Sequence, residues 1–103
     1  MVYSLKITEL ANQELAEIVQ YIAAELSNPD AASRLLDDVD RCYSNLLENP
    51  LMYEACRDDR LAKTGYRRAV IKNYVMVYRV DEREKIVYIM RFFYGKRDYE
   101  KII

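Results

Sequence analysis

The spacing of hydrophobic positions changes along the chain, and each spacing predicts a different element. Residues 3–7 alternate apolar and polar side chains, the period of two that is typical of a half-buried strand. Apolar residues then recur three and four positions apart, at Leu15, Ile18, Ile22 and Leu26. This second spacing predicts an amphipathic helix with one buried stripe.

Polar residues and prolines mark the ends of two predicted helices. Thr8 is a candidate N-cap for the first helix. Asn28 is a candidate N-cap for the second, with Pro29 at the first helical position. The second helix is expected to end near residues 48–50 (Glu-Asn-Pro). Because the connection between the two helices is short, we expect an antiparallel helical hairpin.

The second half of the chain predicts strands. Residues 51–65 show no sustained period, and we expect an irregular connection with one helical turn around 59–63. Residues 66–72, 74–80 and 86–94 are rich in Val, Ile, Tyr and Phe, as strands are. The turns between them are short enough for antiparallel pairing, which predicts a three-stranded meander.

This order of elements predicts an α+β fold. An N-terminal strand is followed by an antiparallel helical hairpin and a three-stranded antiparallel meander, with the helices packed on one face of the sheet. We expect residues 1–103 to form one domain. The other sheet face has no second layer in this prediction. An uncovered face rich in Arg, Lys and Tyr is where we expect function.

The composition narrows the chemistry. The chain contains no histidine, which removes the usual general base and the commonest transition-metal ligand. Cys42 and Cys56 fit neither a disulfide framework nor a zinc site, so we expect reduced thiols, no metal and no cofactor. No apolar run is long enough to span a membrane, and the N-terminus lacks the apolar block of a signal peptide. These features predict a cytoplasmic protein.

The net charge of −1 conceals an asymmetry between the two halves. Up to Ala62 the chain has five basic and twelve acidic residues, whereas from Lys63 onward it has eleven basic and five acidic residues. The basic half indicates a surface that binds a nucleic acid or an acidic protein segment. Alternatively, these charges only solvate exposed strand faces.

Two arginines lie inside predicted strands, where a charged side chain must reach solvent or pair with a carboxylate. For Arg91, which precedes the basic tail, we expect a place in a cationic platform. For Arg79 we expect pairing with a helix carboxylate such as Asp37 or Asp40.

Several segments together resemble the RelE/ParE superfamily of toxins from bacterial type II toxin–antitoxin systems, also called the plasmid stabilization protein family. Residues 16–22 (AEIVQYI) are similar to the first helix of ParE-like toxins, and residues 65–103 are similar to the C-terminal signature of the superfamily. The pieces that carry the resemblance are YRR at 66–68, NY at 73–74 and GKRDY at 95–99. The resemblance implies a toxin that a cognate antitoxin neutralises.

The superfamily divides by target. RelE-like members are ribosome-dependent mRNA endonucleases, which cut without metal, whereas ParE-like members inhibit DNA gyrase and need no nuclease residues. In this sequence Ala69 and Val75 stand where the resemblance implies a lysine and an arginine. Arg67 is a poor general base, because its guanidinium stays protonated. These departures favour the gyrase inhibitor. The endonuclease and a non-toxic regulatory module that only binds antitoxin remain alternatives.

Candidate residues follow from these alternatives. If the protein is a nuclease, the candidate catalytic residues are Arg67, Arg91, Arg97, Tyr94 and Tyr99. The candidate residues for binding a partner (antitoxin, gyrase, or ribosome and mRNA) are Arg68, Lys72, Arg91, Lys96, Arg97 and Tyr99.

Overall fold

Four strands form one mixed sheet in the order β1-β4-β3-β2 in the computed structural model, which describes residues 2–95. The elements, in chain order, are β1 (Ser4–Ile7), α1 (Glu9–Gln20), the π-helical turn η1 (Tyr21–Glu25), α2 (Pro29–Glu48), α3 (Asp59–Lys63), β2 (Tyr66–Ile71), β3 (Tyr74–Asp81) and β4 (Ile86–Tyr94). Strands β2, β3 and β4 are antiparallel, and β1 pairs in parallel with β4. The predicted α+β fold is confirmed.

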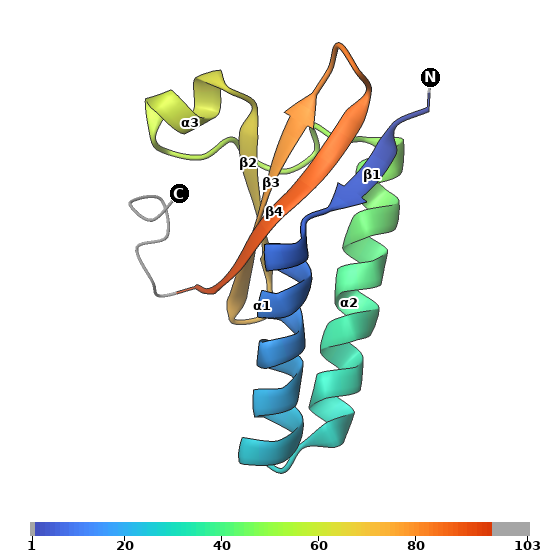
Figure 1. The fold of residues 1–103 in the computed structure, drawn as a ribbon, viewed down its shortest axis with the longest axis vertical. Helices are drawn as coiled ribbons and strands as arrows, with labels where there is room; N and C mark the ends of the chain where they lie inside the picture. The colour runs from blue at the N-terminus through green and yellow to red at the C-terminus, as the bar shows by residue number, and fades with distance from the viewer. Residues whose placement is uncertain (1, 96–103) are drawn as a thin grey trace.

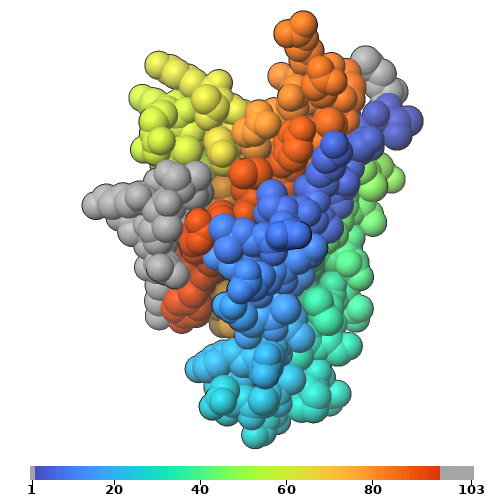
Figure 2. Space-filling view, in the orientation of Figure 1, coloured from blue at the N-terminus to red at the C-terminus, as the bar shows by residue number. Residues whose placement is uncertain are grey.

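The predicted N-cap residues of the two long helices are also confirmed. The Thr8 side chain accepts a hydrogen bond from the Ala11 amide at the start of α1, and Asn28 caps α2 through the Ala31 amide with Pro29 in the first turn. The hairpin of α1 and α2 packs on one face of the sheet, and its tip extends beyond the sheet (Figure 1). The same tip projects from the body of the molecule in the space-filling view (Figure 2).

The main hydrophobic core lies between the hairpin and the sheet. Helix α2 contributes buried residues three and four positions apart, and the strands contribute the side chains that face the helices. Tyr78 is fully buried there, and its hydroxyl donates to the Pro50 carbonyl oxygen at 3.3 Å. This tyrosine therefore belongs to the core.

The opposite face of the sheet is partly covered, so the prediction of a face without a second layer was wrong. Cys56 and Leu61, from the connection and α3, pack with Val75, Val77 and Phe93 in a second buried cluster. Segment 51–65 folds back because it pairs with the edge of β2, where the Cys56 amide donates to the Tyr66 carbonyl. Only part of this face is left for a partner.

Both cysteines, Cys42 and Cys56, are buried, and no disulfide joins them. Among residues 2–95, no helix combines the length and hydrophobicity that crossing a bilayer requires. The same residues contain no cluster of three or more His, Cys, Asp or Glu side chains that would hold a metal ion.

Candidate functional site

Helix α1 follows the edge of β4 beyond the point where β1 ends. The parallel pairing of β1 stops at Ile7 opposite Ile89. Thr8 continues the attachment, since its amide donates to the Ile89 carbonyl at 3.1 Å and its hydroxyl donates to the Met90 carbonyl at 3.2 Å. A β-bulge lies at this point of the β3–β4 ladder. The bulge and Thr8 together set the start of α1 against β4.

Glu14 holds the next part of the same edge. Its Oε1 accepts from the Phe92 amide at 3.1 Å and from Arg91 Nε at 2.9 Å, and its Oε2 accepts from Arg91 Nη2 at 2.9 Å. The Arg91 guanidinium also lies over the Phe93 ring, 4.5 Å from its centroid. The hydrogen bonds that Arg91 donates to Glu14 raise the pKa of Arg91. Arg91 is therefore a paired side chain, which corrects its expected place in a free cationic platform.

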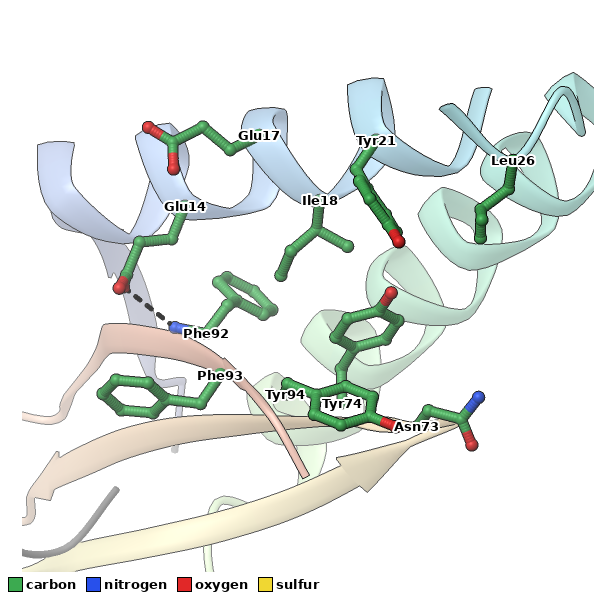
Figure 3. A pocket seen from close by; sticks show the side chains of 10 residues that line it. All are labelled: Glu14, Glu17, Ile18, Tyr21, Leu26, Asn73, Tyr74, Phe92, Phe93 and Tyr94. Atoms are coloured by element: carbon green, nitrogen blue, oxygen red, sulfur yellow. Dashed lines mark hydrogen bonds between the residues drawn. The ribbon is translucent and has the colours of Figure 1, made fainter. Parts of the chain in front are cut away.

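A cleft opens between α1 and the adjoining ends of β3 and β4 (Figure 3). It encloses about 610 Å³. We call it the tyrosine cleft, and its lining residues are Glu14, Glu17, Ile18, Tyr21, Leu26, Asn73, Tyr74, Phe92, Phe93 and Tyr94. Side chains from the helix face those from the strands across the cleft (Figure 3). This volume lies in the range that binding clefts in proteins have.

Three tyrosines, Tyr21, Tyr74 and Tyr94, line the cleft. Tyr21 is 52% exposed and Tyr94 is 49% exposed, so both rings are accessible to a partner. The Tyr74 and Tyr94 rings meet edge to face, with centroids 6.0 Å apart. Burial, and then the proximity of Tyr21 and Tyr94, raise the pKa of Tyr74. Among residues 2–95, the charged residues that line the cleft are acidic, namely Glu14 and Glu17.

The π-helical turn η1 explains how the far end of the cleft is built. The Leu26 amide donates to the Tyr21 carbonyl at 3.1 Å, five residues back, so the turn contains an extra residue. The predicted stripe therefore ends at Ile22, which is buried. Leu26 is rotated away from the core and is 54% exposed, at the cleft. The expected continuation of the stripe to Leu26 was wrong for this reason.

A second cavity of about 280 Å³ continues the tyrosine cleft toward α2. The two share Leu26, Asn73 and Tyr74 in their linings. The charged residues of the second cavity are basic, Arg34 from α2 and Lys72 from the β2–β3 turn. The continuous groove thus has carboxylates at one end, aromatic rings in the middle and cations at the other end.

The structure does not bring Arg67 and Tyr94 into one site. Arg67 of β2 lies opposite Tyr78 of β3, whereas Tyr94 of β4 lies opposite Tyr74 of β3. On β2, the residue opposite Tyr74 is Ile71, four residues after Arg67. Four residues of strand correspond to a separation of about 13 Å along the sheet. Arg67 Nη1 donates to the Leu51 carbonyl at 3.3 Å and to the Tyr53 carbonyl as well. Arg67 thus fixes the connection after α2 against β2.

The other predicted cations are also engaged. Arg68 forms an ion pair with Glu54 at 2.9 Å, and Lys72 lies 3.6 Å from Asp38. Arg79 lies over the Tyr88 ring, 4.9 Å from its centroid, so the expected pairing with Asp37 or Asp40 was wrong. The cause is register, because Arg79 is directly opposite Tyr88 in the β3–β4 ladder. Lys96, Arg97 and Tyr99 lie outside the described residues.

The outer edge of β2 is paired along only part of its length. The Arg68 amide donates to the Glu54 carbonyl at 3.0 Å, on the side away from β3. Peptide groups alternate along an antiparallel strand, so the amide and carbonyl of Val70 face the same outer side. Within residues 2–95 no backbone group pairs with them, and the residue is 62% exposed. This is an open sheet edge.

Of the residues that line the cleft, Tyr94 is a candidate from the sequence, whereas Tyr21, Tyr74 and Glu17 are not among the sequence candidates. A signal was present, because Tyr21 is an aromatic residue that falls off the apolar stripe of its helix. Tyr74 begins a strand directly after a two-residue turn, which places it at the end of the sheet. Neither position indicated that the two would meet across one cleft.

The element order β1, α1, η1, α2, α3, β2, β3, β4, with the helical hairpin on one sheet face, agrees with the fold that the resemblance to RelE/ParE toxins implies. The family described as "ParE toxin of type II toxin-antitoxin system, parDE" matches residues 5–99. This chain belongs to that family of toxins.

Solved structures have the same fold. The chromosomal ParDE system from P. aeruginosa is 22% identical, with a TM-score of 0.70, covering 91% of this chain and 97% of that one. The toxin–antitoxin complex RelBE2 from Mycobacterium tuberculosis is 20% identical, with a TM-score of 0.63 and coverage of 91% and 99%. A free mutant of the E. coli toxin RelE is 14% identical, with a TM-score of 0.65 and coverage of 99% and 93%. Among curated proteins, none matches this chain.

Proposed function

We propose that this protein is a ParE-like toxin that inhibits DNA gyrase by docking on it, and that a cognate antitoxin neutralises it. The observation that carries the proposal is the state of the arginines. Arg67 is held by two backbone carbonyls and Arg91 by the Glu14 carboxylate. Side chains in such contacts stabilise the fold, and Arg67 lies about 13 Å along the sheet from Tyr94, which does not favour a nuclease site that contains both.

The chemistry of the tyrosine cleft supports recognition over RNA cleavage. Cleavage by a 2′-hydroxyl needs a proton acceptor and a cation that stabilises the phosphorane. The cleft has two glutamates, of which Glu14 is occupied by Arg91, and within residues 2–95 its charged lining residues include no cation. This acidic surface would repel a phosphate backbone, but it would not repel a protein segment.

Two surfaces fit the binding of an antitoxin. The open edge of β2 at Val70 offers an amide and a carbonyl to an added strand. The tyrosine cleft offers exposed aromatic and aliphatic surface to a helix or an extended segment. In the M. tuberculosis and P. aeruginosa structures the toxin fold belongs to a toxin–antitoxin system, and we infer the same kind of partner here.

Inducible expression of the toxin without antitoxin tests the proposal. We expect growth arrest with intact messages, altered plasmid supercoiling and induction of the DNA-damage response. Codon-phased cleavage of translated messages would identify an mRNA endonuclease instead, and normal growth would leave a non-toxic antitoxin-binding module. Purified gyrase assayed with and without the toxin then separates direct inhibition from an indirect effect.

A further inference from the structure

We propose that the tyrosine cleft binds an arginine side chain of a partner protein, carried on an amphipathic segment that continues along the groove toward Arg34 and Lys72. The inference rests on the proposed function only in taking the occupant to be a protein. It reverses the simple expectation from sequence, in which the basic half of the chain attracts an acidic partner.

The charge of the cleft favours a cation. Among residues 2–95, Glu14 and Glu17 are its charged lining residues. Glu14 is neutralised by Arg91, with 2.9 Å between Oε2 and Nη2. Glu17, one helical turn further along, is exposed and has no ion-pair or hydrogen-bond partner within residues 2–95. The carboxylate at the rim of the cleft is therefore available to a cation.

The aromatic lining favours a cation as well. Tyr21, Tyr74 and Tyr94 present ring faces and edges around the same space (Figure 3). A guanidinium binds such surroundings well, because its plane stacks on an aromatic face while its N–H groups reach carboxylate and hydroxyl oxygens. An acidic side chain would meet the negative faces of the rings and the Glu17 carboxylate, and would be repelled.

The chain itself uses this chemistry nearby. Arg91 combines a carboxylate partner, Glu14, with an aromatic ring, Phe93, 4.5 Å from the guanidinium carbon. The tyrosine cleft contains the same two kinds of group among its lining residues, with Glu17 as the carboxylate toward the Glu14 end and the tyrosines as the rings. Within residues 2–95, no arginine lines it.

The charges along the groove also indicate the direction in which a partner segment would run. The second cavity shares Leu26 and Tyr74 with the cleft and carries Arg34 and Lys72. A segment with arginine at the Glu17 end, an apolar residue over Leu26 and an acidic residue at the Arg34 end matches all three parts. A segment with its charges reversed would place like charges together at both ends.

The test uses N-acetyl-arginine amide as the probe and N-acetyl-citrulline amide as its uncharged isostere, each titrated into the full chain and followed by amide chemical shifts. We expect saturable shifts at Glu17, Tyr21, Tyr74 and Tyr94 with the arginine probe and much smaller shifts with the citrulline probe. Equal responses to the two probes, or shifts confined to other parts of the chain, would overturn the proposal.

Two variants sharpen the result. Glu17→Gln and Tyr21→Leu are each expected to weaken binding of the arginine probe about threefold, the usual size of an exposed cation–π or ion-pair contribution. Glu25→Gln makes the same chemical change at an exposed position outside the cleft lining and should leave binding unchanged. Unchanged binding in both cleft variants would reject the site, even if the proteins stay folded.

Growth arrest on expression of the wild-type toxin is measured separately. If cells do not arrest but the arginine probe still binds at the cleft, the toxic function fails and the binding site stands. If cells arrest but the probe binds elsewhere, the proposed function stands and this site is rejected.

Discussion

The Glu14 carboxylate accepts two hydrogen bonds from the Arg91 guanidinium, at 2.9 Å from both Nε and Nη2, across 77 positions of sequence. The same carboxylate accepts the Phe92 amide at the open edge of β4. Because β1 ends before this point, a side chain of α1, and not a neighbouring strand, accepts the hydrogen bond from this β4 amide. This contact fixes the helix that forms one wall of the tyrosine cleft.

Loss of the Glu14 carboxylate should destabilise the protein. Glu14→Gln weakens a charge-assisted pair between side chains only 17% and 21% exposed. We expect a loss of about 2 kcal/mol in the free energy of unfolding, measured by urea denaturation. Glu17→Gln is the matched control, expected to change stability by less than about 0.5 kcal/mol because Glu17 is exposed and has no partner in residues 2–95. In the Glu14→Gln/Arg91→Ala double variant the losses should be less than additive, and strict additivity would argue against the pair.

Tyr43 and Tyr78 should respond in opposite ways to loss of the hydroxyl. The Tyr43 hydroxyl is buried and has no hydrogen-bond partner among residues 2–95, so Tyr43→Phe should leave stability unchanged or raise it by about 1 kcal/mol. The Tyr78 hydroxyl donates to Pro50, so Tyr78→Phe should lower stability by about 1 kcal/mol. Thermal or urea unfolding at neutral pH measures both. Destabilisation by Tyr43→Phe would mean that this hydroxyl has a partner in solution.

Alkaline pH should destabilise the protein. Burial raises the pKa of both Tyr43 and Tyr78 above the value of an unfolded tyrosine, about 10. Above pH 10 the unfolded chain loses these protons while the folded chain keeps them, so stability falls by about 1.4 kcal/mol per pH unit for each such tyrosine. Below pH 10 both states keep the protons and these two groups contribute no pH dependence. Tyr43→Phe should reduce the slope, which urea midpoints between pH 9 and pH 11 would detect.

Gly65 should not tolerate a side chain. Its φ is +88°, and an added Cβ would lie 2.6 Å from the Val80 carbonyl oxygen. We expect Gly65→Ala to cost about 2–3 kcal/mol, because it combines backbone strain with a steric clash. Lys85 also has a positive φ, +59°, but it is only half-buried, with its Nζ over the Tyr3 ring. Lys85→Gly is the contrasting variant, and because relief of backbone strain opposes the loss of the Tyr3 contact, it should change stability by at most about 1 kcal/mol.

The open edge of β2 should matter for antitoxin binding. Val70→Pro removes the outward-facing amide without breaking the β2–β3 ladder, since proline is tolerated on edge strands. We expect antitoxin affinity to fall at least about tenfold if the partner adds a strand there. Val70→Thr keeps the amide and should bind close to normally. Equal affinity of both variants in calorimetry would place the antitoxin elsewhere.

The sequence by itself determined the elements, and through them the family. Periods of two and of three to four specify strands and helices locally, and caps such as Thr8 and Asn28 act within one turn of the chain. The short connections left few ways to arrange a hairpin against a meander. Local chemistry was sufficient for these features, and their boundaries agree with the structure to within one or two residues except at η1.

Only the tertiary structure decided which charges are free and where the cleft lies. Arg91 and Glu14 are 77 positions apart, so no local pattern could pair them, and the register of β3 with β4 sets Arg79 over Tyr88. The extra residue in η1 turned Leu26 outward, although its spacing predicted burial. A binding site made of Tyr21 from one half and Tyr74 from the other depends on long-range packing, which the spacing of residues along the chain does not encode.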